Sequence, residues 1–120
     1  VIGRYLIMKG ILVNYEYCTG CHSCEVACKK YLNLPKGEFG IKVSEIGPWQ
    51  YQNAAKGPKK WEWTWMPTLT KACNMCEDRV AEGKMPMCVQ HCQAWCMHYG
   101  EIEELIGEIK EGTRWALLTK

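Results

Sequence analysis

Nine cysteines are the residues most able to carry chemistry in this chain of 120 residues. Four of them lie between Cys18 and Cys28 with the spacing C-x2-C-x2-C-x3-C. The later cysteines begin with a second C-x2-C pair: they are Cys73, Cys76, Cys88, Cys92 and Cys96. Closely spaced thiols form disulfides or bind soft metals, so a disulfide framework, structural zinc and iron–sulfur clusters compete as explanations.

The count and the spacing weigh against disulfides and zinc. An odd number of cysteines without an export-signal pattern disfavours a disulfide framework. Structural zinc usually takes two C-x2-C knuckles separated by a longer span. Cys73 and Cys76 fit this habit, but the segment from Cys18 to Cys28 crowds four thiols without a separate partner knuckle. A zinc-stabilised interaction module therefore remains only as a remote alternative.

The segment from Cys18 to Cys28 has the spacing in which three cysteines hold one 4Fe–4S cluster and the fourth ligates another. A loop around a cluster can reach three iron atoms with two-residue spacings. The next cysteine then lies on the following helix and points toward a second cluster. One such run predicts a second ligand set, which the later cysteines supply. We therefore predict two 4Fe–4S clusters as cofactors.

Short elements are expected to position these cysteines, with strands before each group and helices after the loops. The helix after the first loop should end at Asn33-Leu34-Pro35. The C-terminal helix has one apolar stripe, at Ile102, Leu105, Ile106 and Ile109. We expect strands at 11–17, 39–46, 61–65 and 97–99, the last of which should pair with the first. We expect helices at 25–32 and 101–111, a turn or short helix at 78–83, and an edge strand or docking segment at 115–118.

Residues 47–60 are predicted to form a surface loop, because Gly47-Pro48 breaks the preceding strand and the following residues are polar. Trp61, Trp63 and Trp65 then alternate with polar residues, as in a half-buried strand. We interpret them as the core face of a small sheet. The alternative is an aromatic wall at a partner interface, and six tryptophans suggest that another subunit covers part of the surface.

The chain should fold as a single α+β domain over residues 1–120, with residues 1–7 as an N-terminal extension. A formal net charge of +2 gives no bias toward nucleic acid. The sequence has no continuous apolar run of membrane-spanning length, and we expect a cytoplasmic protein. Its carboxylates are scattered and His91 and His98 are isolated, so we do not expect catalysis by this chain alone.

The segment from Cys18 to Lys29, with Leu34-Pro35, resembles the opening of iron–sulfur electron-transfer (beta) subunits. These subunits serve molybdenum or tungsten pterin enzymes of the dimethyl sulfoxide reductase and formate dehydrogenase type. The later segment resembles their last cluster motif, C-x2-C, eleven residues, C-x3-C-P. The residues that carry this likeness are Cys73 to Arg79, Gly83, Pro86, Cys88, Cys92 and Tyr99-Gly100-Glu101-Ile102.

The resemblance implies a bacterial-ferredoxin-like fold with two short cluster helices and a C-terminal helix. Such subunits usually have four motifs, whereas this chain has the first and the last. It implies that cluster one is held by Cys18, Cys21, Cys24 and Cys92, and cluster two by Cys28, Cys73, Cys76 and Cys88. Gln93 stands where the family has proline, and Cys96 is an extra thiol. We interpret Cys96 as a small buried residue; the alternative is that it replaces Cys92 as a ligand.

The function implied by the resemblance is electron transport in anaerobic metabolism. Two 4Fe–4S clusters would relay electrons between a catalytic oxidoreductase subunit, with a molybdenum or tungsten pterin, and an external electron carrier. The alternatives are a free-standing ferredoxin and a partner of a flavin-dependent reductase.

Overall fold

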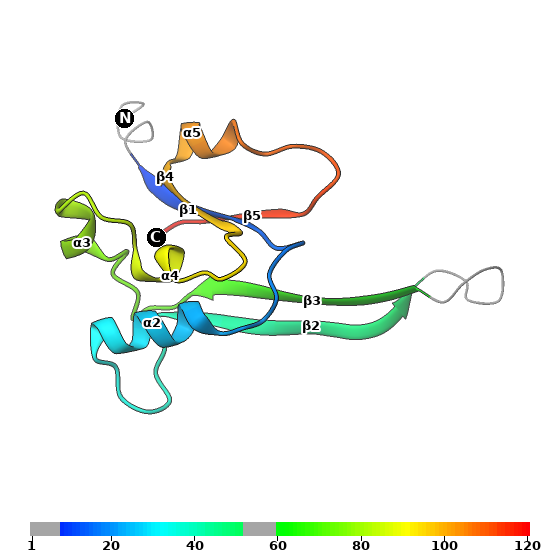
Figure 1. Cartoon of the computed structure of the whole chain (residues 1–120), viewed down its shortest axis with the longest axis horizontal. Helices are drawn as coiled ribbons and strands as arrows, with labels where there is room; N and C mark the ends of the chain where they lie inside the picture. Colours follow the sequence, from blue (N-terminus) through cyan, green and yellow to red (C-terminus); the bar gives the residue numbers. More distant parts are fainter. Residues whose placement is uncertain (1–7, 52–59) are drawn as a thin grey trace.

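The computed structural model describes residues 8–51 and 60–120, so the predicted extension at residues 1–7 lies outside the described residues. Its helices and strands confirm the α+β prediction (Figure 1). In chain order they are β1 (Lys9–Asn14), α2 (Ser23–Leu32), β2 (Ile41–Tyr51), β3 (Lys60–Leu69), α3 (Glu77–Ala81), α4 (Met87–Gln90), β4 (Met97–Glu101), α5 (Ile102–Ile106) and β5 (Trp115–Leu118). None of these helices has the length and apolar character that a membrane crossing requires.

Strand β1 is the centre of a three-stranded antiparallel sheet with the order β4-β1-β5. Its apolar run Ile11-Leu12-Val13 is fully buried, because a central strand has neighbours on both sides and cover on both faces. Ile11 and Val13 pack into the same core as several cysteines. The sheet lies between α5 on one side and α2, α3 and α4 on the other (Figure 1). The predicted pairing of 97–99 with the first strand is confirmed.

The C-terminal helix is shorter than predicted. We expected a helix over 101–111, but α5 ends at Ile106 and is followed by Gly107. Glycine is a poor helix former, so Gly107 favours the end of the helix at this position. Leu105 is buried, while Ile106 and Ile109 are exposed, so half of the predicted apolar stripe does not pack. The edge strand expected at 115–118 is confirmed as β5, next to β1.

A two-stranded hairpin of β2 and β3 projects from this body (Figure 1). The predicted loop at 47–60 is wrong for residues 47–51 and for Lys60, which are strand; residues 52–59 lie outside the described residues. Gly47 and Pro48 of β2 together oppose the single residue Trp63 of β3. This extra residue forms a bulge in β2. A bulge on an edge strand tolerates proline, so Pro48 does not end the strand.

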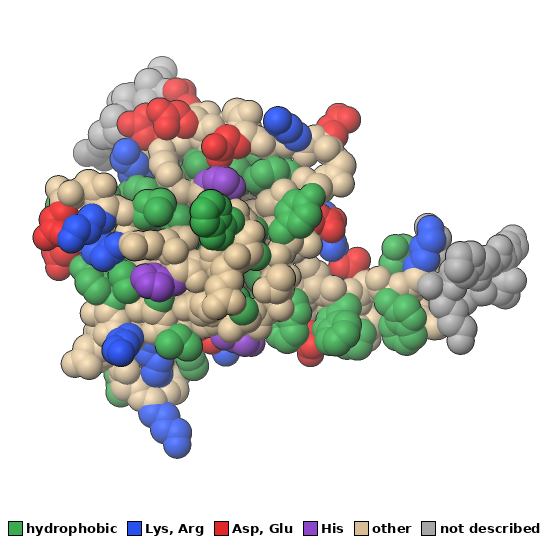
Figure 2. Space-filling model, viewed as in Figure 1, with side chains coloured by type: hydrophobic (Ala, Val, Ile, Leu, Met, Phe, Trp, Pro, Cys, Tyr) green, Lys and Arg blue, Asp and Glu red, His purple; other side chains and the backbone are tan. Residues whose placement is uncertain are grey.

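The tryptophans of the hairpin are mostly exposed, which corrects the interpretation of 61–65 as a core face. Trp63 is 62% exposed, and Trp61 and Trp49 are also exposed. Hydrophobic side chains therefore extend along the projecting hairpin (Figure 2). Trp65 alone of the three alternating tryptophans packs against the core. The alternation correctly indicated a strand, but the hairpin extends beyond the part of the body that could cover it.

Candidate metal centre

The loop before α2 brings the first cysteines around a tight curve. Gly20 and His22 have φ angles of 69° and 62°, in the left-handed region that glycine adopts most easily. A Cβ on Gly20 would collide with the ring of Trp65, so only glycine lets the loop pass this ring. On α2, Cys24 and Cys28 are one turn apart and buried. The helix therefore presents two thiols to the interior at successive positions.

The second half of the chain repeats this arrangement with a different loop. Cys73 and Cys76 lie in the turn before α3, and Asn74 Oδ1 accepts a hydrogen bond of 2.9 Å from the Cys76 backbone N–H. Cys88 is buried on α4, and Cys92 follows four residues later, just after the helix. Helices α2 and α4 pack together, which joins the two cysteine-rich segments.

The structure brings the cysteines predicted for cluster one to a single pocket. This pocket is small and largely enclosed, and Val43, Pro67 and Met97 contribute to its apolar lining. The cysteines that line it are Cys18, Cys21, Cys24, Cys92 and also Cys96. Four of these five are the thiols named from the sequence, and the fifth is the extra thiol.

The cysteines predicted for cluster two also lie close together. Burial, with the neighbouring thiolates of Cys76 and Cys73, raises the pKa of Cys28 to about 11. Burial also raises the pKa of Cys88, and Cys76 and Cys28 raise it further. Cys24, from the first group, also raises the pKa of Cys88. The two groups of cysteines are therefore neighbours.

The buried thiols resist ionisation in the absence of a positive partner. Burial raises the pKa of Cys24 to about 12, well above that of a free cysteine. A cysteine binds metal as the thiolate. The positive charge of a bound metal stabilises this thiolate in the buried site, and the thiol protons are released. A donor set made of thiols in an apolar interior is the kind by which proteins hold iron–sulfur clusters. The residues present therefore fit such clusters.

Cys96 is 3% exposed, and its Sγ lies 3.6 Å from Cys92 Sγ. Hydrogen bonds from Cys96 lower the pKa values of Cys18 and Cys92, while its own pKa is raised. Its burial agrees with the sequence-based interpretation. Its contacts with two predicted ligands could not be read from the sequence, although the repeated x3 spacing at 92 and 96 drew attention to it.

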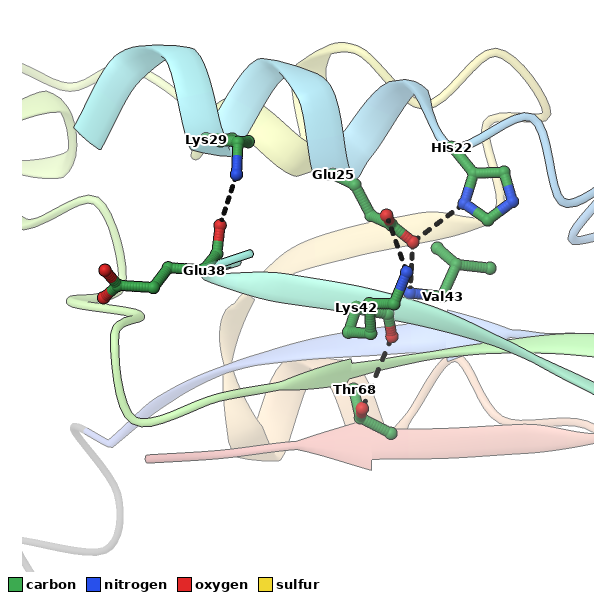
Figure 3. A network of polar contacts seen from close by, with 7 residues as sticks. All are labelled: His22, Glu25, Lys29, Glu38, Lys42, Val43 and Thr68. Atoms are coloured by element: carbon green, nitrogen blue, oxygen red, sulfur yellow. Dashed lines mark hydrogen bonds and ion pairs between the residues drawn. The ribbon is translucent and has the colours of Figure 1, made fainter. Parts of the chain in front are cut away.

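A polar network that the sequence did not reveal holds α2 against the hairpin (Figure 3). Glu25 is only 4% exposed, although it follows the apolar-facing Cys24. Its Oε2 accepts hydrogen bonds from the Val43 backbone N–H at 2.6 Å and from His22 Nδ1 at 2.8 Å. Lys42 Nζ donates to the other oxygen at 3.3 Å. Burial raises the pKa of Glu25, but the bonds from His22, Val43 and Lys42 outweigh it and lower the pKa overall.

Comparison with known proteins gives several similar chains, while no family model matches. The probable anaerobic dimethyl sulfoxide reductase chain YnfG of Escherichia coli K12 is 35% identical over 95 residues, which are 79% of this chain and 33% of that protein. An anaerobic dimethyl sulfoxide reductase chain from the same organism is 34% identical over the same share of each protein. A putative dimethyl sulfoxide reductase iron–sulfur subunit of Halobacterium salinarum is 33% identical over 76 residues, 58% of this chain and 28% of that protein.

The chain is similar in sequence to dimethyl sulfoxide reductase chains, one of which is named as an iron–sulfur subunit. This confirms the resemblance found on the cysteine-rich segments. The chain spans about a third of the length of the curated relatives it matches.

Proposed function

We propose that this chain is an electron-transfer iron–sulfur subunit. It relays electrons through two 4Fe–4S clusters to or from a catalytic oxidoreductase subunit that contains a molybdenum or tungsten pterin. The observation that carries this proposal is the presence of two adjoining groups of thiols, most of them buried or half-buried, in a chain similar to a dimethyl sulfoxide reductase iron–sulfur subunit. Clusters bound by these groups supply one-electron chemistry, and the protein supplies ligation and burial.

In this proposal α2 carries one ligand of each cluster, Cys24 for the first and Cys28 for the second. Cys88 on α4 serves the second cluster, and Cys92, just after α4, serves the first. This assignment is supported by the pocket that the first group lines and by the mutual effects on pKa in the second group. The proposed ligands of cluster one are Cys18, Cys21, Cys24 and Cys92, and those of cluster two are Cys28, Cys73, Cys76 and Cys88.

The residues between the thiols have two tasks. Apolar side chains, among them Val43 and Pro67, exclude water from the first pocket. Backbone N–H groups face the thiols and stabilise negative charge there: the Met75 N–H lies 3.3 Å from Cys73 Sγ, and the Met87 N–H lies 3.4 Å from Cys76 Sγ. Hydrogen bonds to cluster sulfurs and exclusion of solvent are the means by which a protein sets a cluster's potential.

Metal and sulfide analysis of the anaerobically purified protein tests the proposal. We expect about eight iron and eight sulfide per chain, with EPR signals of reduced 4Fe–4S clusters. A colourless protein that contains zinc and no labile sulfide would instead support the zinc-stabilised module. Replacing Cys92 with Ala should remove one cluster, whereas replacing Cys96 with Ala should leave both; the opposite result would exchange their roles.

Purification from the native host tests the partner. We expect the chain to co-purify with a pterin-containing catalytic subunit, and we expect the complex in the cytoplasm. Recovery of a stable chain without a partner would support a free-standing ferredoxin. A co-purifying flavoprotein would support a flavin-dependent reductase.

A further inference from the structure

An open groove of about 640 Å³ runs along the outer face of α2 and reaches α4. Val26, Tyr31 and Met87 contribute apolar side chains to it. Val26 is 63% exposed, although valine is usually a core residue, and Tyr31 is also exposed. The opposite face of α2 carries the buried Cys24 and Cys28, so this helix has an apolar strip on its solvent side as well. Val26 is thus largely uncovered by the described part of the chain.

Cys21 connects this groove with the first cysteine pocket. It lines the groove, and it also lines the enclosed pocket together with Cys18, Cys24 and Cys92. It is the one cysteine of the nine that is exposed. A molecule seated in the groove therefore contacts a proposed cluster ligand directly, with no further layer of protein between them.

The groove has a cationic border. Lys30 lines it, and Arg79 lies against the Tyr31 ring, with Cζ 5.8 Å from the ring centroid. His91 lines it near α4, and the lining that the described residues provide contains no Asp or Glu. Glu77, at the start of the neighbouring α3, lines a different pocket. Lysine or arginine side chains lie next to hydrophobic ones on the side of the molecule where α2 lies (Figure 2).

We propose that the α2–α4 groove is the docking site for an acidic one-electron carrier protein, with Cys21 as the point at which electrons enter or leave. Carboxylates of the carrier would face Lys30 and Arg79, and its apolar side chains would cover Val26 and Tyr31. The inference rests on the proposed function, because it needs a redox-active cluster behind Cys21. Each encounter moves one electron from the reduced carrier to an oxidised cluster, or in the reverse direction, and no bond is made or broken.

The positive charge at the border of the groove is opposite in sign to the net charge expected for the whole protein with its clusters. Each oxidised cluster with four thiolates carries a charge of roughly −2, so two clusters change the formal +2 of the chain to about −2. A net negative protein repels an acidic carrier at long range. Binding then depends on the cations that border the groove, which makes their individual replacement informative.

The test uses the holoprotein and a photoreduced acidic plant-type 2Fe–2S ferredoxin as the carrier. The bimolecular rate of cluster reduction is measured by stopped flow at low and high salt. Charge at the border of an interface mainly sets the association rate and its salt dependence. For Lys30→Glu we expect a fall of about tenfold or more at low salt and a weaker salt dependence than in the wild type.

The matched control is Lys110→Glu, which makes the same change in net charge. Lys110 is exposed in the segment after α5, and α5 lies on the opposite side of the central sheet from α2 (Figure 1). We expect its rate to stay within about twofold of the wild type. Reduction by the methyl viologen radical, a small cation that needs no docking site, should not be slower in either variant than in the wild type.

The outcomes separate the inference from the function on which it rests. Absence of iron and labile sulfide from the wild-type protein defeats the proposed function. A protein with a full cluster content in which Lys30→Glu and Lys110→Glu are reduced at equal rates by ferredoxin defeats the docking site alone. A Lys30→Glu protein that has lost iron would show a structural effect, and Lys30→Gln, which removes the charge without reversing it, then decides: an unchanged ferredoxin rate overturns the docking site.

Discussion

Replacing Glu25 with alanine is expected to destabilise the folded protein by about 2–4 kcal/mol. The carboxylate of Glu25 joins α2, which carries two proposed ligands, to strand β2 of the hairpin (Figure 3). Alanine removes the acceptor for the buried Val43 N–H and both side-chain contacts, to His22 and Lys42. The helix would remain, but its attachment to the hairpin would weaken.

The magnitude follows from the three contacts. A buried N–H that loses its acceptor costs about 1–3 kcal/mol, and Val43 is such a donor. The side chains of His22 and Lys42 are 41% and 45% exposed, so solvent screens their ion pairs, which add about 1 kcal/mol together. Glu25→Gln keeps an acceptor for Val43 and loses the charge, so we expect a cost of about 1 kcal/mol.

Urea unfolding of the holoprotein under anaerobic conditions measures these differences, with tryptophan fluorescence and cluster absorbance as probes. With a slope of about 1.5 kcal/mol per M, the midpoint for Glu25→Ala should fall by about 1.3–2.7 M, and that for Glu25→Gln by about 0.7 M. Glu38→Ala is the control, because Glu38 enters the network only through its backbone oxygen. If Glu25→Ala unfolds at the wild-type midpoint, the carboxylate does not hold α2 to the hairpin.

Three further substitutions test other parts of the structure. Gly20→Ala should lower the free energy of unfolding by about 1–3 kcal/mol from overpacking alone, and so lower the urea midpoint, because its Cβ would collide with the Trp65 ring; an unchanged midpoint would contradict this packing. Gly40→Ala would place a Cβ 2.5 Å from Cys28 Sγ, so we expect iron to fall toward about four per chain, and retention of about eight would argue against Cys28 as a ligand in this position. Trp63→Ala should leave the same midpoint unchanged, because this exposed side chain packs little within the chain; a clear loss of stability would show that it does.

The cysteine groups could be predicted from the sequence because their geometry is local. A spacing of four residues on a helix fixes Cys24 and Cys28 one turn apart, whatever the rest of the chain does. The pairing of the first strand with 97–99 was also predicted, and the structure confirms it. Local rules were sufficient where local geometry decides the structure.

The remaining features depend on contacts between distant segments. The bulge at Gly47 needs the partner strand, since a Cβ there would collide with the Glu62 backbone oxygen. Glu25 looks like an ordinary exposed helix residue until Val43 and Lys42, from β2, come to lie against it. Cys96 likewise meets its neighbours only after the turn that follows α4 brings it back to the first pocket. A single sequence carries no marker for such pairings.

The sharing of α2 and α4 between two pockets bears on how the protein is made in the cell. With the proposed ligands, neither cluster has its full ligand set until Cys88 and Cys92 have been synthesised and have left the ribosome. Scaffold proteins that deliver iron and sulfide would thus meet a chain with eight unprotected thiols, open to oxygen and to wrong metals. Insertion of one cluster fixes both helices and so prepares the site of the other. Maturation should then be all-or-none, with few chains carrying a single cluster.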